Sequence, residues 1–327
     1  MALEKNNRGN SGNSGNNGGD SDDGKARKAR PVVITPKSLG AWPLPQPADD
    51  DDKEARGRVL VIGGSTEIAG AVVLAATAAL RAGAGKMQIA TCRSLAPHVS
   101  MAVPEARVIG LAETAAGGIA AGGVKQLGEE LAGAQAVLVG PGMVDKAATA
   151  RLMRNLLRHL EHATLVLDAG AFAFLNAAPQ GLARLGGRVV LTPHAGEMAS
   201  LLGIEKAEVE AEPWRTVRRA VAELGAVVAL KGRETLIAAP ASRNVYCNRA
   251  GNVGLATSGS GDTLSGVVAG LAARGATPFQ AAVWGVHLHA RAGDELARRM
   301  GPLGFLAREL LAEIPTLMAK LNKPKKR

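Results

Sequence analysis

A carboxylate lies at the point where a run of small residues passes into an apolar segment with helical spacing. The stretch GNVGLATSGSGDTLSGVVAGLAARG, residues 251–275, places Asp262 directly after Gly259, Ser260 and Gly261. Ser260 or Asp262 could cap the helix that begins here. The alternative is chemical, because a helix N-terminus binds anions and a carboxylate fixed beside a bound phosphate can act as a base. The stretch by itself leaves both interpretations open.

Three further motifs place polar side chains directly after apolar runs. Asp168 follows TLVL and could cap the segment that begins at 171. His194 and Glu197 are three residues apart in TPHAGE, where Glu197 could be the acid of a capping box. This pair lacks the second histidine of the zinc-binding motif HExxH. KGRET, residues 231–235, has a glycine flanked by cationic side chains and followed by a hydroxyl. This sequence could form a hairpin turn, and its cations and hydroxyl could also bind the phosphate or ribose of a nucleotide.

Two glycine-rich turns also follow apolar runs, and the established phosphate motifs are missing. GGS at 63–65 and GPG at 140–142 are each explained equally well by a tight turn. GAGK at 83–86 lacks the first Walker glycine and has Met87 where Ser or Thr must bind magnesium. Neither GAG nor GSG is followed by the third glycine of the dinucleotide fingerprint. Any nucleotide must therefore be held in another way.

Short apolar runs alternate with longer helical segments along the chain, and each motif lies where a run ends. The pattern predicts strands at 58–64, 86–92, 135–142, 164–170, 188–194 and 226–232. It predicts helices at 69–83, 146–161, 195–202, 207–224, 261–274 and 278–298. Strands that are apolar throughout and alternate with helices indicate an α/β fold with a mostly parallel sheet covered on both faces. In such sheets the ligand binds outside the carboxyl ends of the strands.

Composition divides the chain into a leader, one folded domain and a tail. Residues 1–30 include a glycine–asparagine run with almost no apolar side chains, which predicts a disordered leader. The folded domain is expected over 31–319, and 320–327 is a basic tail with five Lys/Arg and no acid. Much of the formal net charge of +10 lies in these two ends. With aromatic residues at 2% of the chain, a nucleic-acid partner is not expected.

Cysteine usage and hydropathy indicate a cytoplasmic protein. Cys92 and Cys247 form no CxxC pattern, so we expect neither a disulfide framework nor a metal site, only buried small side chains. The N-terminus lacks the apolar core of a signal peptide. The longest clean apolar run, 69–80, is too short to span a bilayer, so no membrane association is expected.

The order of the motifs carries more information than any one of them. GGS, GPG, LDAG, TPHAGE, LKGRET and GSGD, followed by AAVWGVHLHARAGDELA, resemble the ADP/ATP-dependent NAD(P)H-hydrate dehydratases. The resemblance runs from about residue 33 to 299, with Ile68 and Val253 as local departures. It implies a ribokinase-like, three-layer αβα fold. It also implies an activity: nucleotide-dependent repair of the S forms of NADH hydrate and NADPH hydrate, by phosphorylation of the hydroxyl and elimination of phosphate.

The resemblance also implies roles for individual residues. Asp262 would be the base, and the backbone N–H groups around Gly259, Ser260 and Gly261 would form the anion hole. The AMP moiety would be lined by Lys231, Gly232, Arg233, Glu234, Thr235 and Gly261. The hydrate would be contacted by Ala71, Gly142, His194 and Asp262. Mg2+ would bridge the nucleotide phosphates, with Glu197 as a residue that reaches the ion indirectly.

The resemblance also leads to expectations about the phosphoryl donor, the oligomeric state and a partner enzyme. The donor is expected to be ADP, giving AMP, with ATP as the other candidate. A homotetramer is expected, as is a separate epimerase chain acting in the same pathway. The nearest rival is an ATP-dependent small-alcohol kinase of the ribokinase superfamily, similar to hydroxyethylthiazole kinase. A non-catalytic nucleotide-binding or RNA-associated protein is a third interpretation, against which the intact GSGD weighs.

Overall fold

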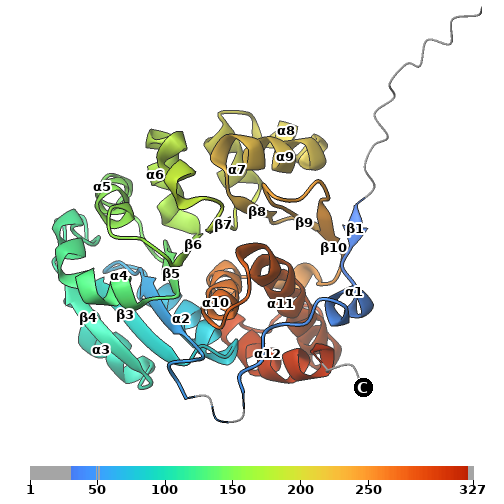
Figure 1. The fold of residues 1–327 in the computed structure, drawn as a ribbon, viewed down its shortest axis with the longest axis horizontal. Coiled ribbons are helices and arrows are strands. Elements are labelled where there is room, and N and C mark those ends of the chain that lie inside the picture. Colours follow the sequence, from blue (N-terminus) through green and yellow to red (C-terminus); the bar gives the residue numbers. More distant parts are fainter. Residues whose placement is uncertain (1–30, 49, 51, 323–327) are drawn as a thin grey trace, which may run out of the picture.

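One continuous sheet spans the part of the chain that the structure describes, residues 31–48, 50 and 52–322 of a computed structural model (Figure 1). The order of its ten strands is β1-β10-β9-β8-β7-β6-β5-β2-β3-β4, and only β9 runs antiparallel to its neighbours. The strands are β1 (Val32–Val33), β2 (Arg58–Ile62), β3 (Lys86–Cys92), β4 (Ala106–Leu111), β5 (Ala136–Val139), β6 (Thr164–Leu167), β7 (Val189–Leu191), β8 (Val227–Leu230), β9 (Thr235–Ala238) and β10 (Tyr246–Asn248).

The α/β class and the six predicted strands are confirmed, with ends that are up to three residues shorter than expected. β1, β4, β9 and β10 were not predicted. β4 is only partly buried, so its sequence lacks the continuous apolar run of the central strands. β1 and β10 contain two and three residues, too few to establish a pattern. The leader at 1–30 and tail residues 323–327 lie outside the described residues.

Alternate side chains of the central strands build two separate cores, one on each face of the sheet. In β2, Val59 and Val61 join the core beneath α2 (Gly70–Arg81), α10 (Ser260–Ala273), α11 (Pro278–Met300) and α12 (Ala307–Leu321), whereas Leu60 and Ile62 join the core beneath the helices of residues 128–224. All four side chains have no exposed surface. This two-sided burial explains why the parallel strands are apolar at every position, and Figure 1 shows the two helical layers.

The helices confirm most of the predicted segments. They are α1 (Pro36–Gly40), α2 (Gly70–Arg81), α3 (Ala96–Ala102), α4 (Gly128–Gly133), α5 (Lys146–Leu157), α6 (Phe172–Ala177), α7 (Ala195–Leu202), α8 (Lys206–Ala211), α9 (Pro213–Leu224), α10 (Ser260–Ala273), α11 (Pro278–Met300) and α12 (Ala307–Leu321). None of them is long and apolar enough to cross a membrane.

Two predictions about helices are wrong in detail. The segment 207–224 is two helices rather than one, because Pro213 lacks the N–H that would continue α8 and instead occupies the first turn of α9. No helix was predicted after residue 298, but α12 continues to Leu321 and so includes the first two residues of the expected basic tail. α12 contains Pro315, which weakens its helical pattern in the sequence.

The helix that follows the GSGD motif packs against α2 at backbone distance. A Cβ atom added to Gly266 would lie 2.2 Å from the carbonyl oxygen of Ala75, and one added to Gly270 would lie 2.4 Å from that of Ala79. Real Cβ atoms do not approach backbone atoms so closely. The two glycines therefore let α10 lie directly on α2, which fixes where the N-terminus of α10 meets the sheet.

Replacing Gly266 by alanine should lower the free energy of unfolding by about 1–3 kcal/mol, because the added methyl group forces the two helix backbones apart. Gly128→Ala, at the start of α4, is the matched control, since nothing lies within 4 Å of the added atom. The control should be neutral or stabilising by up to about 1 kcal/mol. Urea unfolding of both variants measures the difference, and equal midpoints would contradict the close approach of α10 to α2.

Candidate active site

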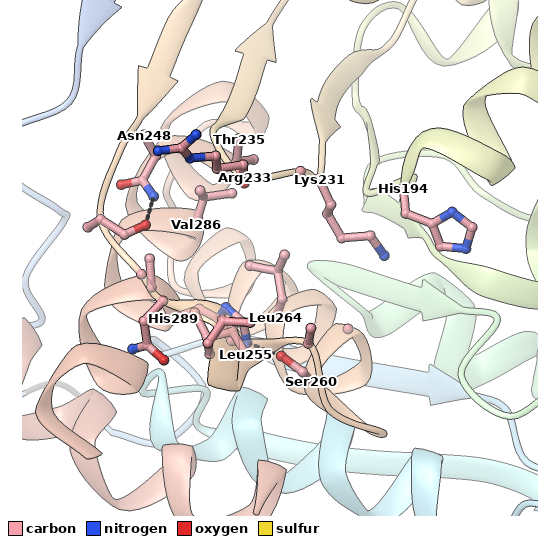
Figure 2. A pocket seen from close by; sticks show the side chains of 18 of the residues that line it. His194, Lys231, Arg233, Thr235, Asn248, Leu255, Ser260, Leu264, Val286 and His289 are labelled. Carbon is pink, nitrogen blue, oxygen red and sulfur yellow. Dashed lines mark hydrogen bonds between the residues drawn. The ribbon is translucent and has the colours of Figure 1, made fainter. Parts of the chain in front are cut away.

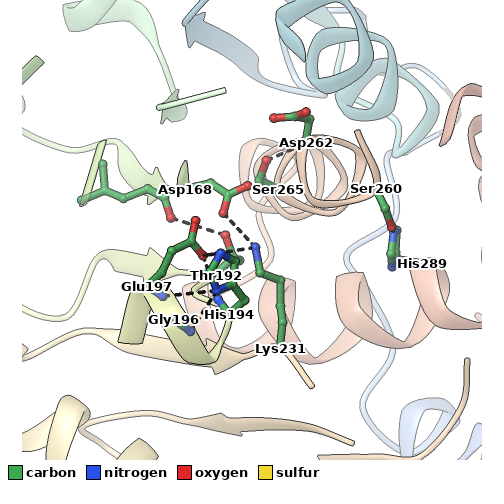
Figure 3. Close-up of polar contacts among 11 residues, drawn as sticks. Asp168, Thr192, His194, Gly196, Glu197, Lys231, Ser260, Asp262, Ser265 and His289 are labelled. Carbon is green, nitrogen blue, oxygen red and sulfur yellow. Dashed lines mark hydrogen bonds and ion pairs between the residues drawn. The ribbon is translucent and has the colours of Figure 1, made fainter. Parts of the chain in front are cut away.

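Polar side chains from three neighbouring strands converge at the carboxyl edge of the sheet. Asp168 follows β6, His194 follows β7 and Lys231 follows β8. The backbones of His194 and Lys231 form a parallel bridge, and the Lys231 N–H donates to the carbonyl of Pro193 at 2.8 Å. The N-terminus of α10 lies beside this edge (Figure 3). Motifs far apart in the sequence are thereby brought together, as the parallel sheet predicts.

Asp168 is the most buried charged group of this cluster. Its side chain is 2% exposed, and its Oδ1 lies 3.2 Å from Nζ of Lys231. The interpretation of Asp168 as a cap is wrong, since its side chain makes no capping hydrogen bond to the turn at Ala169–Ala171. Ala169 has φ +46°, the only positive value at a non-glycine residue in the described part of the chain. This strained backbone turns the chain away and leaves the carboxylate facing Lys231.

Lys231 is surrounded by carboxylates. Nζ lies 3.7 Å from Oε2 of Glu197, in addition to its contact with Asp168. Burial lowers the pKa of Lys231, but attraction to Asp168, Glu197 and Asp262, with the hydrogen bond to Asp168, outweighs burial and raises it. The ammonium group is therefore charged throughout the physiological range and neutralises part of a negative cluster.

His194 and Glu197 form the capping box predicted for them at the start of α7. His194 Nδ1 accepts hydrogen bonds from the N–H groups of Gly196 and Glu197, at 3.0 and 3.2 Å. Oε2 of Glu197 accepts from the N–H of His194 at 2.8 Å. A ring that accepts at Nδ1 carries its proton on Nε2. Nε2 of His194 lies 3.6 Å from Oε2 of Glu197, beyond hydrogen-bond distance, and the side chain is 59% exposed, so that this N–H can reach a ligand.

The start of α10 is not capped by a side chain, so the capping interpretation of Ser260 and Asp262 is wrong. Gly259 is the N-cap, with φ +83°, where an added Cβ would lie 2.5 Å from Leu74. The Ser260 N–H donates to the carbonyl of Thr257 at 3.3 Å. The N–H groups of Gly261 and Asp262 have no protein acceptor among the described residues. These two free donors are suited to an anion.

Asp262 lies on the side of α10 that faces the cluster. Burial raises its pKa to about 6, with repulsion from Asp168 and Glu197 adding to the effect and Lys231 opposing it. The start of α10 lies close to the same groups, because a Cβ added to Gly261 would be in ordinary van der Waals contact with Nζ of Lys231, at 3.4 Å, and with Oδ2 of Asp168, at 3.6 Å. A carboxylate with a pKa of about 6 is ionised at pH 7 and is a stronger proton acceptor than an ordinary aspartate.

The two glycine-rich turns pack against the same edge. Gly142 has φ +68°, and an added Cβ would lie 3.0 Å from Cβ of Ala71 and 2.5 Å from the carbonyl oxygen of Ile68. The predicted hydrate-binding residues Ala71 and Gly142 are therefore neighbours. Gly140, with φ +125°, lies against the backbone of Asp168, where an added Cβ would be 1.8 Å from its carbonyl oxygen. These turns shape the space around the carboxylate cluster.

A cavity of about 860 Å³ opens beside the N-terminus of α10 (Figure 2). That volume is within the range of small-molecule sites. Its polar lining includes His194, Lys231, Arg233, Thr235 and Ser260. Its apolar lining includes Leu255, Leu264, Val286 and Ala290. A site with cations and free N–H groups together with an apolar wall is suited to a nucleotide.

Most residues predicted for the nucleotide line this cavity, and one does not. Lys231, Gly232, Arg233, Thr235 and Gly261 are all in its wall. The side chain of Glu234 is instead held by Arg249, whose Nε lies 3.0 Å from Oε1, and by the thiol of Cys247 at 3.3 Å from Oε2. KGRET is also a hairpin connection, since it joins the antiparallel strands β8 and β9. Both interpretations of this motif are thus compatible.

Several cavity residues were missed by sequence reasoning. Asn248 at the end of β10 and His289 within α11 both line the wall. His287 Nδ1 lies 2.9 Å from Oδ1 of Asn248, and His289 Nε2 lies 3.1 Å from Oγ of Ser260. Burial lowers the pKa of both histidines to about 4. The only indication in the sequence was a pair of histidines within an otherwise apolar helical run.

Cys92 and Cys247 are buried and unpaired, as expected. Burial raises the pKa of both thiols to about 11. Each thiol is therefore protonated at neutral pH and behaves as a small packing group rather than a nucleophile.

Comparison with known proteins agrees with this geometry. The sequence profile of the NAD(P)H-hydrate dehydratase family matches residues 59–316. An ADP-dependent (S)-NAD(P)H-hydrate dehydratase from Xanthomonas campestris is 47% identical over 288 residues, covering 88% of this chain and 96% of that protein. A bifunctional NAD(P)H-hydrate repair enzyme from Moorella thermoacetica is 40% identical, over 85% of this chain and 52% of its own length.

Solved structures share the fold. The ADP/ATP-dependent NAD(P)H-hydrate dehydratase from Bacillus subtilis, co-crystallised with ATP and Mg2+, superposes with a TM-score of 0.71 at 27% identity. It covers 89% of this chain and 99% of that one. A hydroxyethylthiazole kinase from Pyrococcus horikoshii superposes with a TM-score of 0.53 at 19% identity, over 82% and 92% of the two chains. The second likeness shows the ribokinase-like fold alone.

Asp168→Asn should lower the pKa of Asp262, because it removes a neighbouring negative charge and leaves Lys231 free to stabilise the Asp262 carboxylate. Carbon-13 NMR titration of the aspartate carboxyl groups measures the change, and the resonance of Asp262 is assigned by its loss in Asp262→Asn. Glu223→Gln, on the exposed surface of α9, removes one negative charge away from the cluster and should leave this titration unmoved. A pKa for Asp262 that stays near 6 in Asp168→Asn would show that the two carboxylates do not interact.

Proposed function

Since the chain belongs to the NAD(P)H-hydrate dehydratase family, we propose that it uses ADP to return the S forms of NADH hydrate and NADPH hydrate to NADH and NADPH. The observation that carries the proposal is Asp262. It is a carboxylate with a pKa raised to about 6, on the first turn of a helix whose free N–H groups lie beside a nucleotide-sized cavity. That arrangement is a base next to a phosphate site.

The chemistry follows from the leaving group. Hydroxide is a poor leaving group, so the hydrate hydroxyl is first converted to a phosphate ester. Asp262 takes the proton of the hydrate hydroxyl while the oxygen of that hydroxyl bonds to the β-phosphorus of ADP. The bond from this phosphorus to the oxygen that bridges it to the α-phosphorus breaks, and AMP is released. The ring nitrogen lone pair then expels phosphate, and loss of a proton from the neighbouring ring carbon restores the double bond. Free N–H groups at the start of α10 stabilise negative charge on the transferred group.

The nucleotide and the hydrate are assigned to adjoining regions. Lys231, Gly232, Arg233, Thr235 and Gly261 are proposed to hold the AMP moiety, supported by their place in the cavity wall. Glu234 is proposed to act only through Arg249 and Cys247, given the contacts of its side chain.

The hydrate is proposed to lie against Ala71, Gly142, His194 and Asp262. The contact between Gly142 and Ala71 and the exposed Nε2–H of His194 support this assignment.

The carboxylates of the site suit an ion brought in with the nucleotide. Among the described residues, no group of three or more His, Cys, Asp or Glu side chains is placed to hold a metal. Mg2+ is usually bound by substrate phosphates and waters with few protein ligands, so a site without a protein cage fits it. When bound, Mg2+ would neutralise charge on the nucleotide phosphates. Glu197 is proposed to reach it through water, with its carboxylate also holding the start of α7.

ADP is proposed as the donor in preference to ATP. The relative from Xanthomonas, which is matched over almost its whole length, is named as ADP-dependent. The more distant Bacillus relative is named as using either nucleotide. The alternative function, an ATP-dependent small-alcohol kinase, has only a fold likeness at 19% identity behind it. The two differ in product, since a kinase leaves a stable phosphate ester.

We also propose a homotetramer that works in the cytoplasm beside a separate epimerase chain. The two unpaired, buried cysteines support a reducing compartment. The Xanthomonas relative, 96% of which is matched, carries a dehydratase name alone and supports the division of labour.

Asp262→Asn should lower kcat by about 10²–10⁴-fold while ADP still binds, because the base is lost and the cavity is intact. Recovery of reduced-nicotinamide absorbance from purified NADH hydrate, with Mg2+ and either ADP or ATP, measures the reaction. Phosphate release equal to the NADH formed is expected from the wild type. No recovery with either nucleotide would overturn the proposed function, and a stable phosphorylated hydrate would indicate a kinase.

The ratio kcat/KM for ADP should rise with pH through a single group near pH 6 and level off above it. Asp262 must be unprotonated to accept the proton, and its pKa in the free enzyme is raised to about 6. AMP formation is the suitable measurement, because it does not depend on the stability of NADH in acid. A profile that is flat between pH 5 and 8 would show that Asp262 titrates elsewhere or is not the base.

A further inference from the structure

A serine and a histidine meet in the wall of the nucleotide cavity. Oγ of Ser260, the first residue of α10, lies 3.1 Å from Nε2 of His289 in α11. Both residues line the cavity, and they are 6% and 8% exposed (Figures 2 and 3). The contact joins α10 to α11 through two residues that are 29 positions apart in the sequence. It is not needed for the capping of α10, which begins at Gly259 without a side-chain cap.

The hydroxyl of Ser260 differs from the other hydroxyls of the same helix. Thr263 Oγ1 donates to the carbonyl of Gly259 at 3.1 Å, and Ser265 Oγ donates to the carbonyl of Asp262 at 3.1 Å. Such bonds to the preceding turn are the usual fate of hydroxyls inside helices. Ser260 Oγ makes no bond of this kind within the described chain and is directed to His289 instead.

The backbone N–H of Ser260 already has an acceptor. It donates to the carbonyl of Thr257, whereas the N–H groups of Gly261 and Asp262 are free. Among the three residues expected to form the anion hole, Ser260 therefore has its hydroxyl rather than its amide to offer to a phosphate.

His289 is suited to orient that hydroxyl. Burial lowers its pKa to about 4. A hydrogen bond with the backbone of Ser260 opposes this change and the nearby charge of Lys231 adds to it, so the ring is neutral at working pH. A neutral imidazole has one donor and one acceptor nitrogen. When Nε2–H donates to Oγ, the serine hydrogen is left free to point into the cavity. A neutral ring does so without adding charge beside Lys231 and Asp262.

We propose that His289 is a positioning residue that holds the Ser260 hydroxyl so that it donates a hydrogen bond to the phosphoryl group leaving the nucleotide. Ser260 is then a catalytic side chain in its own right, in addition to being part of the backbone turn. This inference rests on the proposed function. The alternative role for such a pair, with His289 as a base that activates Ser260, would make His289 titrate during turnover.

The test compares Ser260→Ala, His289→Gln and the double variant, with Thr263→Ala as control. The control removes a buried hydroxyl from the same turn that bonds only to the backbone. For Ser260→Ala we expect kcat to fall about 10–100-fold, somewhat less than for loss of a main oxyanion donor, with little change in AMP affinity. His289→Gln should give a smaller loss, and none when Ser260 is already alanine. Ser260→Thr should restore most of the rate.

A second readout separates this inference from the proposed function. Calorimetric titration of the wild type and Ser260→Ala with ADP and with AMP measures whether the hydroxyl contacts the second phosphate. Selective weakening of ADP in Ser260→Ala supports the inference even if the wild type fails to dehydrate the hydrate. A kcat within twofold of wild type in Ser260→Ala would overturn it, as would independent, multiplying losses in the double variant. Loss of the rise in activity near pH 6 in His289→Gln would also overturn it, in favour of His289 as a base.

Discussion

The buried carboxylate of Asp168 and its ion pair with Lys231 are the constraint on which the site depends. A carboxylate that is 2% exposed must have a partner of opposite charge, because an unpaired buried ion is very costly. The two residues are 63 positions apart and can meet only if β6, β7 and β8 lie side by side and in register. The pair also sets the environment of Asp262, which is repelled by one member and attracted by the other.

Close backbone approach is the second requirement, and it explains the unusual number of small residues. Gly266 lets α10 lie on the backbone of α2. Gly140 brings the turn after β5 onto the backbone of Asp168. Larger side chains at these positions would move the free N–H groups of α10 away from the charged cluster. The packing of α10 on α2 therefore helps to fix where the start of α10, and with it Asp262, lies relative to the charged cluster.

Two kinds of feature could be predicted from the sequence: helices and strands, from the spacing of apolar residues, and the polar residues that follow each strand. Continuous apolar runs identified six strands, and the parallel order placed Asp168, His194 and Lys231 at one edge. Individual contacts between side chains could not be predicted in this way. The ion pair of Asp168 and the contact between Ser260 and His289 link residues distant in the chain, and no local pattern reports such contacts. Short strands such as β10 are fixed by neighbours rather than by their own sequence, so the cavity wall at Asn248 was also missed.

About half a turn of α10 separates the two side chains proposed to take part in the chemistry, Ser260 and Asp262. Successive residues of an α-helix are 100° apart, so Ser260 and Asp262 project from nearly opposite sides of α10. Figure 3, which views this helix almost along its axis, shows Ser260 beside His289 and Asp262 on another side, near Asp168. The nucleotide cavity is lined by Ser260 and Gly261 but not by Asp262. The nucleotide, as phosphoryl donor, would lie on one side of the helix start, and the hydrate, as phosphoryl acceptor, on the other. The transferred phosphoryl group would then lie at the free N–H groups between them. In the proposed reaction, the Gly-Ser-Gly-Asp sequence would thereby place a phosphate between the nucleotide and the base.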